Sequence, residues 1–167
     1  MTSAQGPSLR QRLLLGQPVL NRVDELRGDD ERVAQFWSDP RARVLVLYGD
    51  SVDITGEATS PELDLTPTAD IGDERPPEAF LLGLAGDVPV FGLIDDSEEA
   101  VASGGDSRST LRKVGALLSE RDGELITTTM AHGNWHRTHP RCPRCGAETL
   151  VERAGWVRRC PVDEALH

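Results

Sequence analysis

The sequence has no long hydrophobic run and almost no lysine. Its longest apolar stretches, such as residues 44–47, are far too short to span a bilayer, which needs about 20 apolar residues. Residues 1–20 contain a basic stretch and three consecutive leucines, but no long apolar region with a small-residue cleavage site. We therefore predict no signal peptide, no membrane partner and a cytoplasmic location. Lys113 is the only lysine beside 17 arginines, a bias that reflects genome composition more than chemistry.

What is present is typical of a folded domain. The 167 residues are 38% hydrophobic and 28% charged, which is too apolar for a wholly disordered chain. This length can form one globular domain with a real core and a small additional module.

The net charge of −10 is unevenly distributed. Residues 1–106 hold 8 Arg and 21 Asp or Glu, for a charge of −13, whereas residues 107–167 carry +3. Binding to a phosphate backbone depends on cationic contacts, so the acidic part is not expected to bind nucleic acid, and +3 is a weak signal for the rest.

Hydrophobic periodicity and turn residues predict a grouped order of strands and then helices. Residues 43–48 form one expected strand, and a hairpin is expected with Gly86–Asp87 as its turn. The expected elements, in chain order, are helical turns at 9–17, a helix capped by Asp29 or Asp30 and ending near Trp37, strands at 43–48, 79–85 and 88–94, and helices at 107–118 and 123–136, the last capped by Asp122; segments 56–78 and 95–106 are expected to be loops. This order predicts an α+β fold.

The same pass divides the chain into four parts. Residues 1–18 are a predicted flexible leader, 19–106 the α+β domain, 107–140 a helical connector and 141–167 a compact module that contains cysteine. Four large aromatic side chains follow the helix and strand patterns and are expected in the core: Phe36, Trp37, Phe80 and Phe91.

The last 26 residues contain all three cysteines. Cys142 and Cys145 form a Cys-x2-Cys turn followed by glycine, and Cys160 comes after 14 intervening residues. A zinc ribbon pairs two such turns, or knuckles, so that four ligands close a structural zinc site. Asp163 stands where the fourth cysteine is expected, and His167 is an alternative fourth ligand. A hairpin that has lost its metal and is held by packing alone is the competing interpretation.

Several segments together resemble the NADH pyrophosphatases, a family of Nudix hydrolases, in their actinobacterial form. Residues 135–146 and 155–161 are similar to the helix end and the two knuckles of that family, and residues 20–27 and 40–45 are similar to its opening. The resemblance covers about residues 19–167. The knuckle segments are fairly specific when taken together, whereas the opening segment alone is a weak signal.

The resemblance implies a rudimentary Nudix-like N-terminal domain, a zinc-ribbon β-hairpin and then a catalytic Nudix domain. Such enzymes hydrolyse the pyrophosphate of NAD(H) to nicotinamide mononucleotide and AMP, some remove NAD caps from RNA, and they generally form homodimers. Their Mg²⁺ or Mn²⁺ is held by the carboxylates of the Nudix box, which this sequence lacks; Glu98–Glu99 has neither the Arg-Glu nor the spaced glycines and is expected to be a solvated loop. We therefore expect no catalytic residue here, no activity of this chain alone, and NAD(H) binding only together with the catalytic domain.

Other residues are weighed against simpler roles. We expect Trp135 to pack the helix against the ribbon. Trp156 is expected to pack over the hairpin or against the catalytic domain, although it could stack on a base or a nicotinamide ring. Arg158 and Arg159 are expected to be solvated or to contact the catalytic domain, although they could bind phosphate. His136 and His139 are expected to be structural, and His132 has no evident partner. The alternative function is a stand-alone zinc-ribbon module that binds nucleic acid or a protein; a regulatory dimerisation partner is a third.

Overall fold

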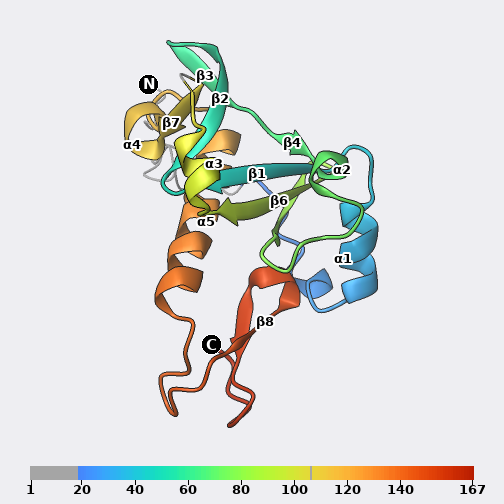
Figure 1. The fold of residues 1–167 in the computed structure, drawn as a ribbon. Helices are drawn as coiled ribbons and strands as arrows, with labels where there is room; N and C mark the ends of the chain where they lie inside the picture. Colours follow the sequence, from blue (N-terminus) through green and yellow to red (C-terminus); the bar gives the residue numbers. More distant parts are fainter. Residues whose placement is uncertain (1–18, 106) are drawn as a thin grey trace, which may run out of the picture.

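The structure, a computed structural model, describes residues 19–105 and 107–167. A mixed β-sheet forms its centre, helices lie on both faces, and a small hairpin module projects at the C-terminal end (Figure 1). The predicted leader at 1–18, with its helical turns at 9–17, lies outside the described residues.

Helical segments and strands are interspersed along the chain. The helical segments are η2 (Asp24–Leu26), α1 (Asp30–Trp37), α2 (Thr68–Ile71), α3 (Glu98–Ala102), α4 (Leu111–Val114), α5 (Glu120–Thr138) and η3 (Arg153–Gly155). The strands are β1 (Arg43–Tyr48), β2 (Ser51–Glu57), β3 (Ser60–Leu63), β4 (Thr66–Pro67), β5 (Phe80–Ala85), β6 (Val88–Asp95), β7 (Arg108–Thr110), β8 (Leu150–Glu152) and β9 (Val157–Arg159).

Strand β1 lies at the centre of a seven-stranded sheet. Five of its strands follow the order β3-β2-β1-β6-β5, and the short strands β4 and β7 pair with β1 and β2. Strand β1 runs parallel to β6 and antiparallel to β2 and β4. Its side chains alternate between the two faces, so that Leu45 and Leu47 join the core under α5 and Val44 and Val46 join the core under α1. A strand buried on both faces needs a continuous apolar sequence, and residues 44–47 supply it.

The two covering helices begin at good N-caps. The Asp29 carboxylate accepts the backbone N–H of Arg32 at the start of α1, and Ser119 Oγ accepts the N–H of Asp122 at the start of α5. Helix α1 buries Val33, Phe36 and Trp37 against one face of the sheet, as predicted. Helix α5 begins earlier than predicted, because Ser119 rather than Asp122 is its cap.

The strand and hairpin predictions around residues 43–48 and 79–94 are confirmed, and so is the α+β class with its C-terminal hairpin. The prediction of a loop at 56–78 was wrong, because it contains the end of β2 together with β3, β4 and α2. Only one face of β3 is buried, and it is too short to give a clear periodic signal. The predicted helix at 107–118 is instead β7 followed by the single turn α4, since β7 is recruited by pairing with β2.

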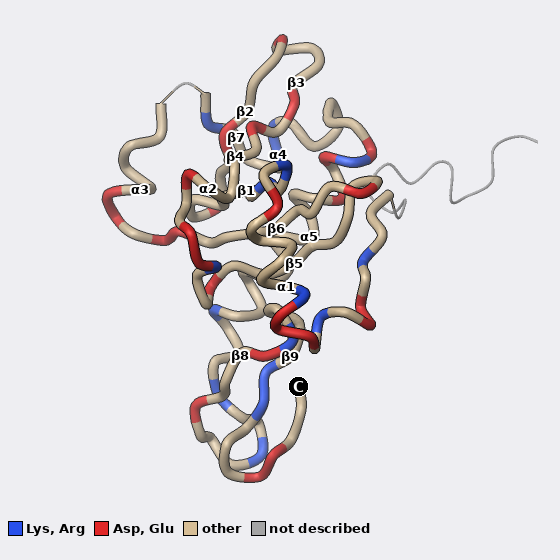
Figure 2. Tube along the Cα trace, turned by 90° about the vertical axis from the view of Figure 1, so that its right-hand side faces the viewer, with Lys and Arg blue, Asp and Glu red and all other residues tan. Residues whose placement is uncertain are grey.

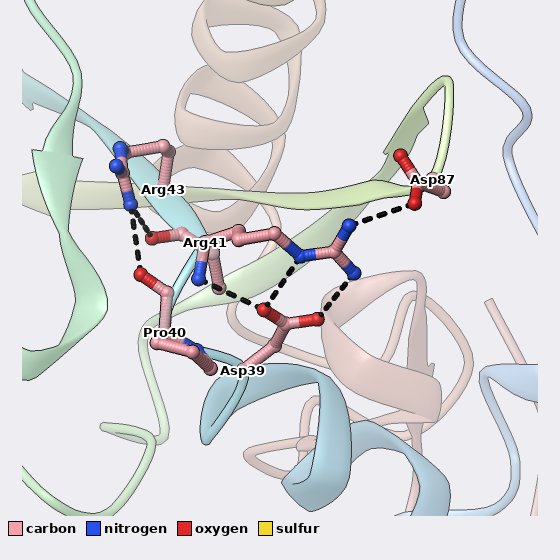
Figure 3. A network of polar contacts seen from close by, with 6 residues as sticks. Asp39, Pro40, Arg41, Arg43 and Asp87 are labelled. Atoms are coloured by element: carbon pink, nitrogen blue, oxygen red, sulfur yellow. Dashed lines mark hydrogen bonds and ion pairs between the residues drawn. The ribbon is translucent and has the colours of Figure 1, made fainter.

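Residues 39–43 lead into β1 through a network of polar contacts. The Arg41 guanidinium pairs with Asp39 at 2.9 Å and with Asp87 in the β5–β6 turn at 2.7 Å (Figure 3). Arg43 donates to the carbonyl of Ala42 at 2.9 Å. These side chains hold the beginning of β1 beside the neighbouring turn, so the similarity at residues 40–45 reflects architecture.

Candidate metal centre

The C-terminal module is built from two knuckles with the same backbone pattern. In the first, the N–H of Gly146 donates to the carbonyl of Cys142 at 2.9 Å, and Cys142 Sγ accepts the N–H of Arg144 at 3.4 Å. In the second, the N–H of Glu164 donates to the carbonyl of Cys160 at 3.0 Å, and Cys160 Sγ accepts the N–H of Val162 at 3.4 Å. The second knuckle therefore has the backbone of a Cys-x2-Cys turn although its fourth position is aspartate.

One residue of the second knuckle adopts a backbone conformation that normally favours glycine. Gly146 closes the first turn with a φ of 76°, and Glu164 occupies the equivalent place with a φ of 58°. A non-glycine residue at such an angle costs about 1–2 kcal/mol. In this conformation the backbone N–H of Glu164 closes the turn onto the carbonyl of Cys160.

The knuckles bring four ligand-type side chains together: Cys142, Cys145, Cys160 and Asp163, whose ligand atoms all lie within 4.8 Å of one another. Cys145 Sγ lies 3.5 Å from Cys160 Sγ, and Cys142 Sγ lies 3.6 Å from an Asp163 oxygen. A tetrahedral zinc ion with Zn–S bonds of about 2.3 Å places its ligands roughly 3.8 Å apart, so the donor set and its spacing fit this metal. In the part of the chain that the structure describes, no other group of three or more such residues meets this test.

His167, the alternative ligand, is not part of this group. Its backbone N–H donates to the carbonyl of Arg158 at 2.9 Å, and its carbonyl accepts the N–H of Arg158 at 3.0 Å. The last residue thus extends the pairing alongside β9 instead of turning into the cluster.

In the absence of metal, the ligand side chains of the cluster shift one another's pKa values. A hydrogen bond with Asp163 raises the pKa of Cys160 to about 11, and the same bond lowers the pKa of Asp163. Burial raises the pKa of Cys142, but donation from the backbone N–H groups of Arg144 and Cys145 outweighs it and the net shift is downward. Metal binding at this site must displace thiol protons.

The ribbon hairpin is joined to the α/β unit through the turn η3 and Trp156. The Trp156 Nε1–H donates to the carbonyl of Leu81 in β5 at 2.6 Å. The Arg27 guanidinium carbon lies 3.5 Å from the Trp156 ring centroid, and the His132 ring packs edge-on with centroids 4.0 Å apart. Ala154 is buried in the same core as α1. The hairpin is therefore packed into the sheet's own core; we call this contact the ribbon joint, formed by Arg27, His132, His136, residues 154–156 and Arg158.

A second set of contacts in the ribbon joint involves Arg158. This side chain is only 7% exposed, and it donates to Thr149 Oγ1 at 2.7 Å and to His136 Nδ1 at 2.9 Å. The opposite ring nitrogen of His136 donates to the carbonyl of Gly155 at 3.0 Å. Arg158 is not solvated, contrary to that part of the expectation, because the hairpin turns this strand position inward. Figure 2 shows basic positions along the hairpin that contains β8 and β9.

Sequence reasoning missed most of the ribbon joint. Trp135, expected to pack the helix on the ribbon, is half-buried and stacks beside His136 of its own helix at 4.7 Å. Trp156 takes that role instead, and His132 proves to be its partner. The only signal was the Gly-Trp pair at 155–156, which marks a close backbone approach followed by a large apolar side chain. His139 is exposed, and Glu98–Glu99 lies in α3 on the surface, apart from the cluster.

None of the helices in the described ranges is both long enough and apolar enough to cross a membrane.

The fold and the cluster define the class of protein: an α/β unit that carries a ribbon hairpin with three cysteines and one aspartate at its tip. Residues 137–167 match the family described as the NADH pyrophosphatase zinc ribbon domain. The chain is 30% identical over 181 aligned residues to the NAD-capped RNA hydrolase NudC of Mycobacterium tuberculosis (strain ATCC 25618 / H37Rv), covering 97% of this chain and 51% of that protein. The corresponding protein of Mycobacterium bovis (strain BCG / Pasteur 1173P2) gives the same values.

A shorter similarity, 37% over 57 residues, links 34% of the chain to 16% of the human mitochondrial NAD(P)H pyrophosphatase NUDT13. The chain is thus similar to the NADH pyrophosphatases, and residues 137–167 match their zinc ribbon domain. It spans about half the length of the mycobacterial relatives it matches.

Proposed function

We propose that this chain is the non-catalytic N-terminal and ribbon portion of an NAD(H) pyrophosphatase, and that Cys142, Cys145, Cys160 and Asp163 hold one structural zinc ion. The observation that carries the proposal is the four-residue cluster at the tip of a hairpin packed into the α/β core. Zinc supplies folding free energy to a hairpin too small to stabilise itself. Three thiols in this role require a reducing compartment, which supports a cytoplasmic location.

In the whole enzyme, the reaction would be hydrolysis of NAD(H) to nicotinamide mononucleotide and AMP, with NAD-capped RNA as a further substrate class. The activities for which the mycobacterial and human relatives are named support this assignment. The Mg²⁺ or Mn²⁺ would bind to carboxylates of a catalytic domain, and this chain would supply the scaffold and part of a homodimer surface. We propose the four parts 1–18, 19–106, 107–140 and 141–167 as its working divisions.

The alternative of a stand-alone nucleic-acid module receives less support. Its best candidate for base stacking, Trp156, is occupied by Leu81, Arg27 and His132 in the ribbon joint. Arg158, a candidate phosphate ligand, is buried against Thr149 and His136.

Elemental analysis of the purified, reduced chain tests the metal proposal. We expect about one zinc per chain, lost in Asp163→Ala and retained in His167→Ala. The neighbouring Glu164→Gln, which keeps the shape of an exposed knuckle residue, is the matched control and should retain zinc. Reduced wild-type protein without zinc would contradict the proposal, and loss only in His167→Ala would contradict the choice of Asp163.

Two further measurements address the non-catalytic role. With NADH and Mn²⁺, the chain should give no turnover above a Cys142→Ala control, and sedimentation should show a dimer. Turnover clearly above that control would place catalysis within this chain. Tight, salt-sensitive binding of single-stranded RNA by wild type would favour the alternative function instead.

A further inference from the structure

Two histidines lie at the centre of the ribbon joint, one helical turn apart on α5. His132 is 9% exposed, and its ring contacts Trp156 of the ribbon and Phe80 of β5, with centroids 4.0 and 4.9 Å away. His136 contacts the ribbon through Gly155 and Arg158. Both rings therefore sit between the α/β unit and the hairpin and touch each side.

The hydrogen bonds of His136 require a neutral ring. Its Nε2 faces the Gly155 carbonyl and must carry the proton, while its Nδ1 faces the Arg158 guanidinium and must accept. A second proton would point an N–H at the N–H of Arg158. His132 Nδ1 is buried, and within the described residues it has no hydrogen-bond partner, so nothing there would stabilise a charged ring.

The charged groups in direct contact with the His136 ring and with Trp156 are arginines. Arg27 is stacked on Trp156, and Arg22 lies 5.9 Å from the same ring. Arg158 comes from β9 on the ribbon side. The nearest acidic residues act on arginines: Asp24 and Glu25 on Arg27, Glu148 on Arg158, and Glu124 pairs with Arg22. His136 also lines a cavity shared with acidic residues, but the hydrogen bonds of its ring go to Gly155 and Arg158; these acidic residues include Asp24, Glu25, Glu78, Asp96 and Glu152.

We propose that the ribbon joint is acid-sensitive: protonation of His132 and His136 releases the ribbon hairpin from the α/β unit while the sheet remains folded. A charge on either ring meets arginine on one side and apolar surface on the other. The ribbon can separate because, in the described part of the chain, the core under α5 contains no ribbon residue, and Ala154 is the ribbon residue in the core under α1. This inference concerns the docking of the hairpin and goes beyond its metal content.

The lowered pKa values of the two histidines also indicate that acid weakens docking of the ribbon. Burial, followed by the positive charges of His136, Arg27 and Arg22, lowers the pKa of His132 from 6.5 to about 4. Burial is also the main cause that lowers the pKa of His136. Docking is therefore fully stable above pH 6.5, where both rings are neutral in either state, and it weakens as the pH falls from 6.5 towards 4.

Nuclear magnetic resonance of the full zinc-loaded chain provides the test. The indole N–H of Trp156, assigned with Trp156→Phe, reports docking because it donates to Leu81. The methyl groups of Leu45 and Val90 report the sheet. Between pH 7 and pH 4.5 we expect the Trp156 signal to shift and exchange with water while the methyl signals persist.

Histidine variants distinguish release of the ribbon by histidine protonation from release caused by loss of zinc at low pH. Zinc analysis at each pH measures the loss of zinc. His132→Phe keeps an aromatic ring, and His136→Gln keeps a donor towards Gly155 and an acceptor towards Arg158. The double variant should retain docking to a pH at least one unit lower, and His139→Gln on the exposed helix end should match wild type. If His132→Phe does not fold, His136→Gln alone must show part of this shift.

Either of two results would overturn the proposal. One is a wild-type ribbon that stays docked through pH 4.5. The other is a double variant that undocks at the same pH as wild type, which would assign the change to thiol protonation and metal loss. A chain without zinc at pH 7 would contradict the metal proposal but not this one, provided that the histidine variants still shift the docking transition.

Discussion

Gly155 meets Phe80 at the closest approach between the ribbon and the sheet. An added Cβ would overlap the Cβ of Phe80, and the residue has a φ of +93°. Gly86 has a φ of +66° with open space around it, so it isolates the backbone component of the same substitution.

Gly155→Ala is therefore expected to destabilise the chain by about 3 kcal/mol, because overpacking is added to backbone strain. Gly86→Ala should cost only about 1 kcal/mol, from strain alone. Urea unfolding followed by circular dichroism measures both. Equal losses in the two variants would mean that Phe80 moves away without cost.

Trp156 and Trp135 provide a second comparison between single residues. Trp156→Phe leaves the Leu81 carbonyl without its donor, and a buried unsatisfied group costs about 1–3 kcal/mol. Trp135 is half-buried, so Trp135→Phe should cost clearly less. The difference in unfolding free energy between the variants is the measured quantity, and its reversal would restore Trp135 as the main ribbon contact.

The knuckle hairpin is the element whose chemistry depends most on pH. Asp163 raises the pKa of Cys160 to about 11 in the absence of metal, so this thiol is protonated at neutral pH. Zinc must displace that proton, and the competition weakens as the pH rises.

Zinc affinity is therefore expected to increase between pH 6.5 and 8.5, by about tenfold per pH unit for each proton released. Competition with a chromophoric chelator measures the affinity at each pH. Asp163→Asn should bind zinc more weakly at every pH in this range, because the carboxylate ligand is gone. An affinity that does not change with pH would contradict proton displacement.

At the scale of the whole molecule, the ribbon and the sheet share one core through Ala154. Removal of zinc should unfold residues 141–167 and lower the melting temperature of the remainder by several degrees, because a loss of about 1 kcal/mol already shifts a domain of this size by 2–4 °C. Hydrogen exchange should show lost protection in β8 and β9 and retained protection in β1 and β6. A chelated chain with unchanged β8 and β9 protection would show that packing alone holds the hairpin.

Elements with a strong local signal could be predicted from the sequence. The apolar run of β1, the hairpin of β5 and β6, the Asp29 cap of α1 and the Cys-x2-Cys turn each depend on residues close together in the chain. The β2–β3 hairpin and β7 escaped prediction because their short strands are stabilised by partners far away in sequence. The same limit explains why a loop at 56–78 and a helix at 107–118 were predicted in their place.

The sequence by itself determined the α+β class, the position of the metal module and the residue types of its ligands, because spacing and periodicity are local properties. Only the tertiary structure decided that Asp163, and not His167, lies beside the cysteines, since that choice depends on how the chain end pairs with Arg158. It also decided that Trp156, His132 and Arg158 meet in the ribbon joint. These contacts join residues from α5 and the hairpin that are far apart in the sequence, so no local sequence pattern predicts them.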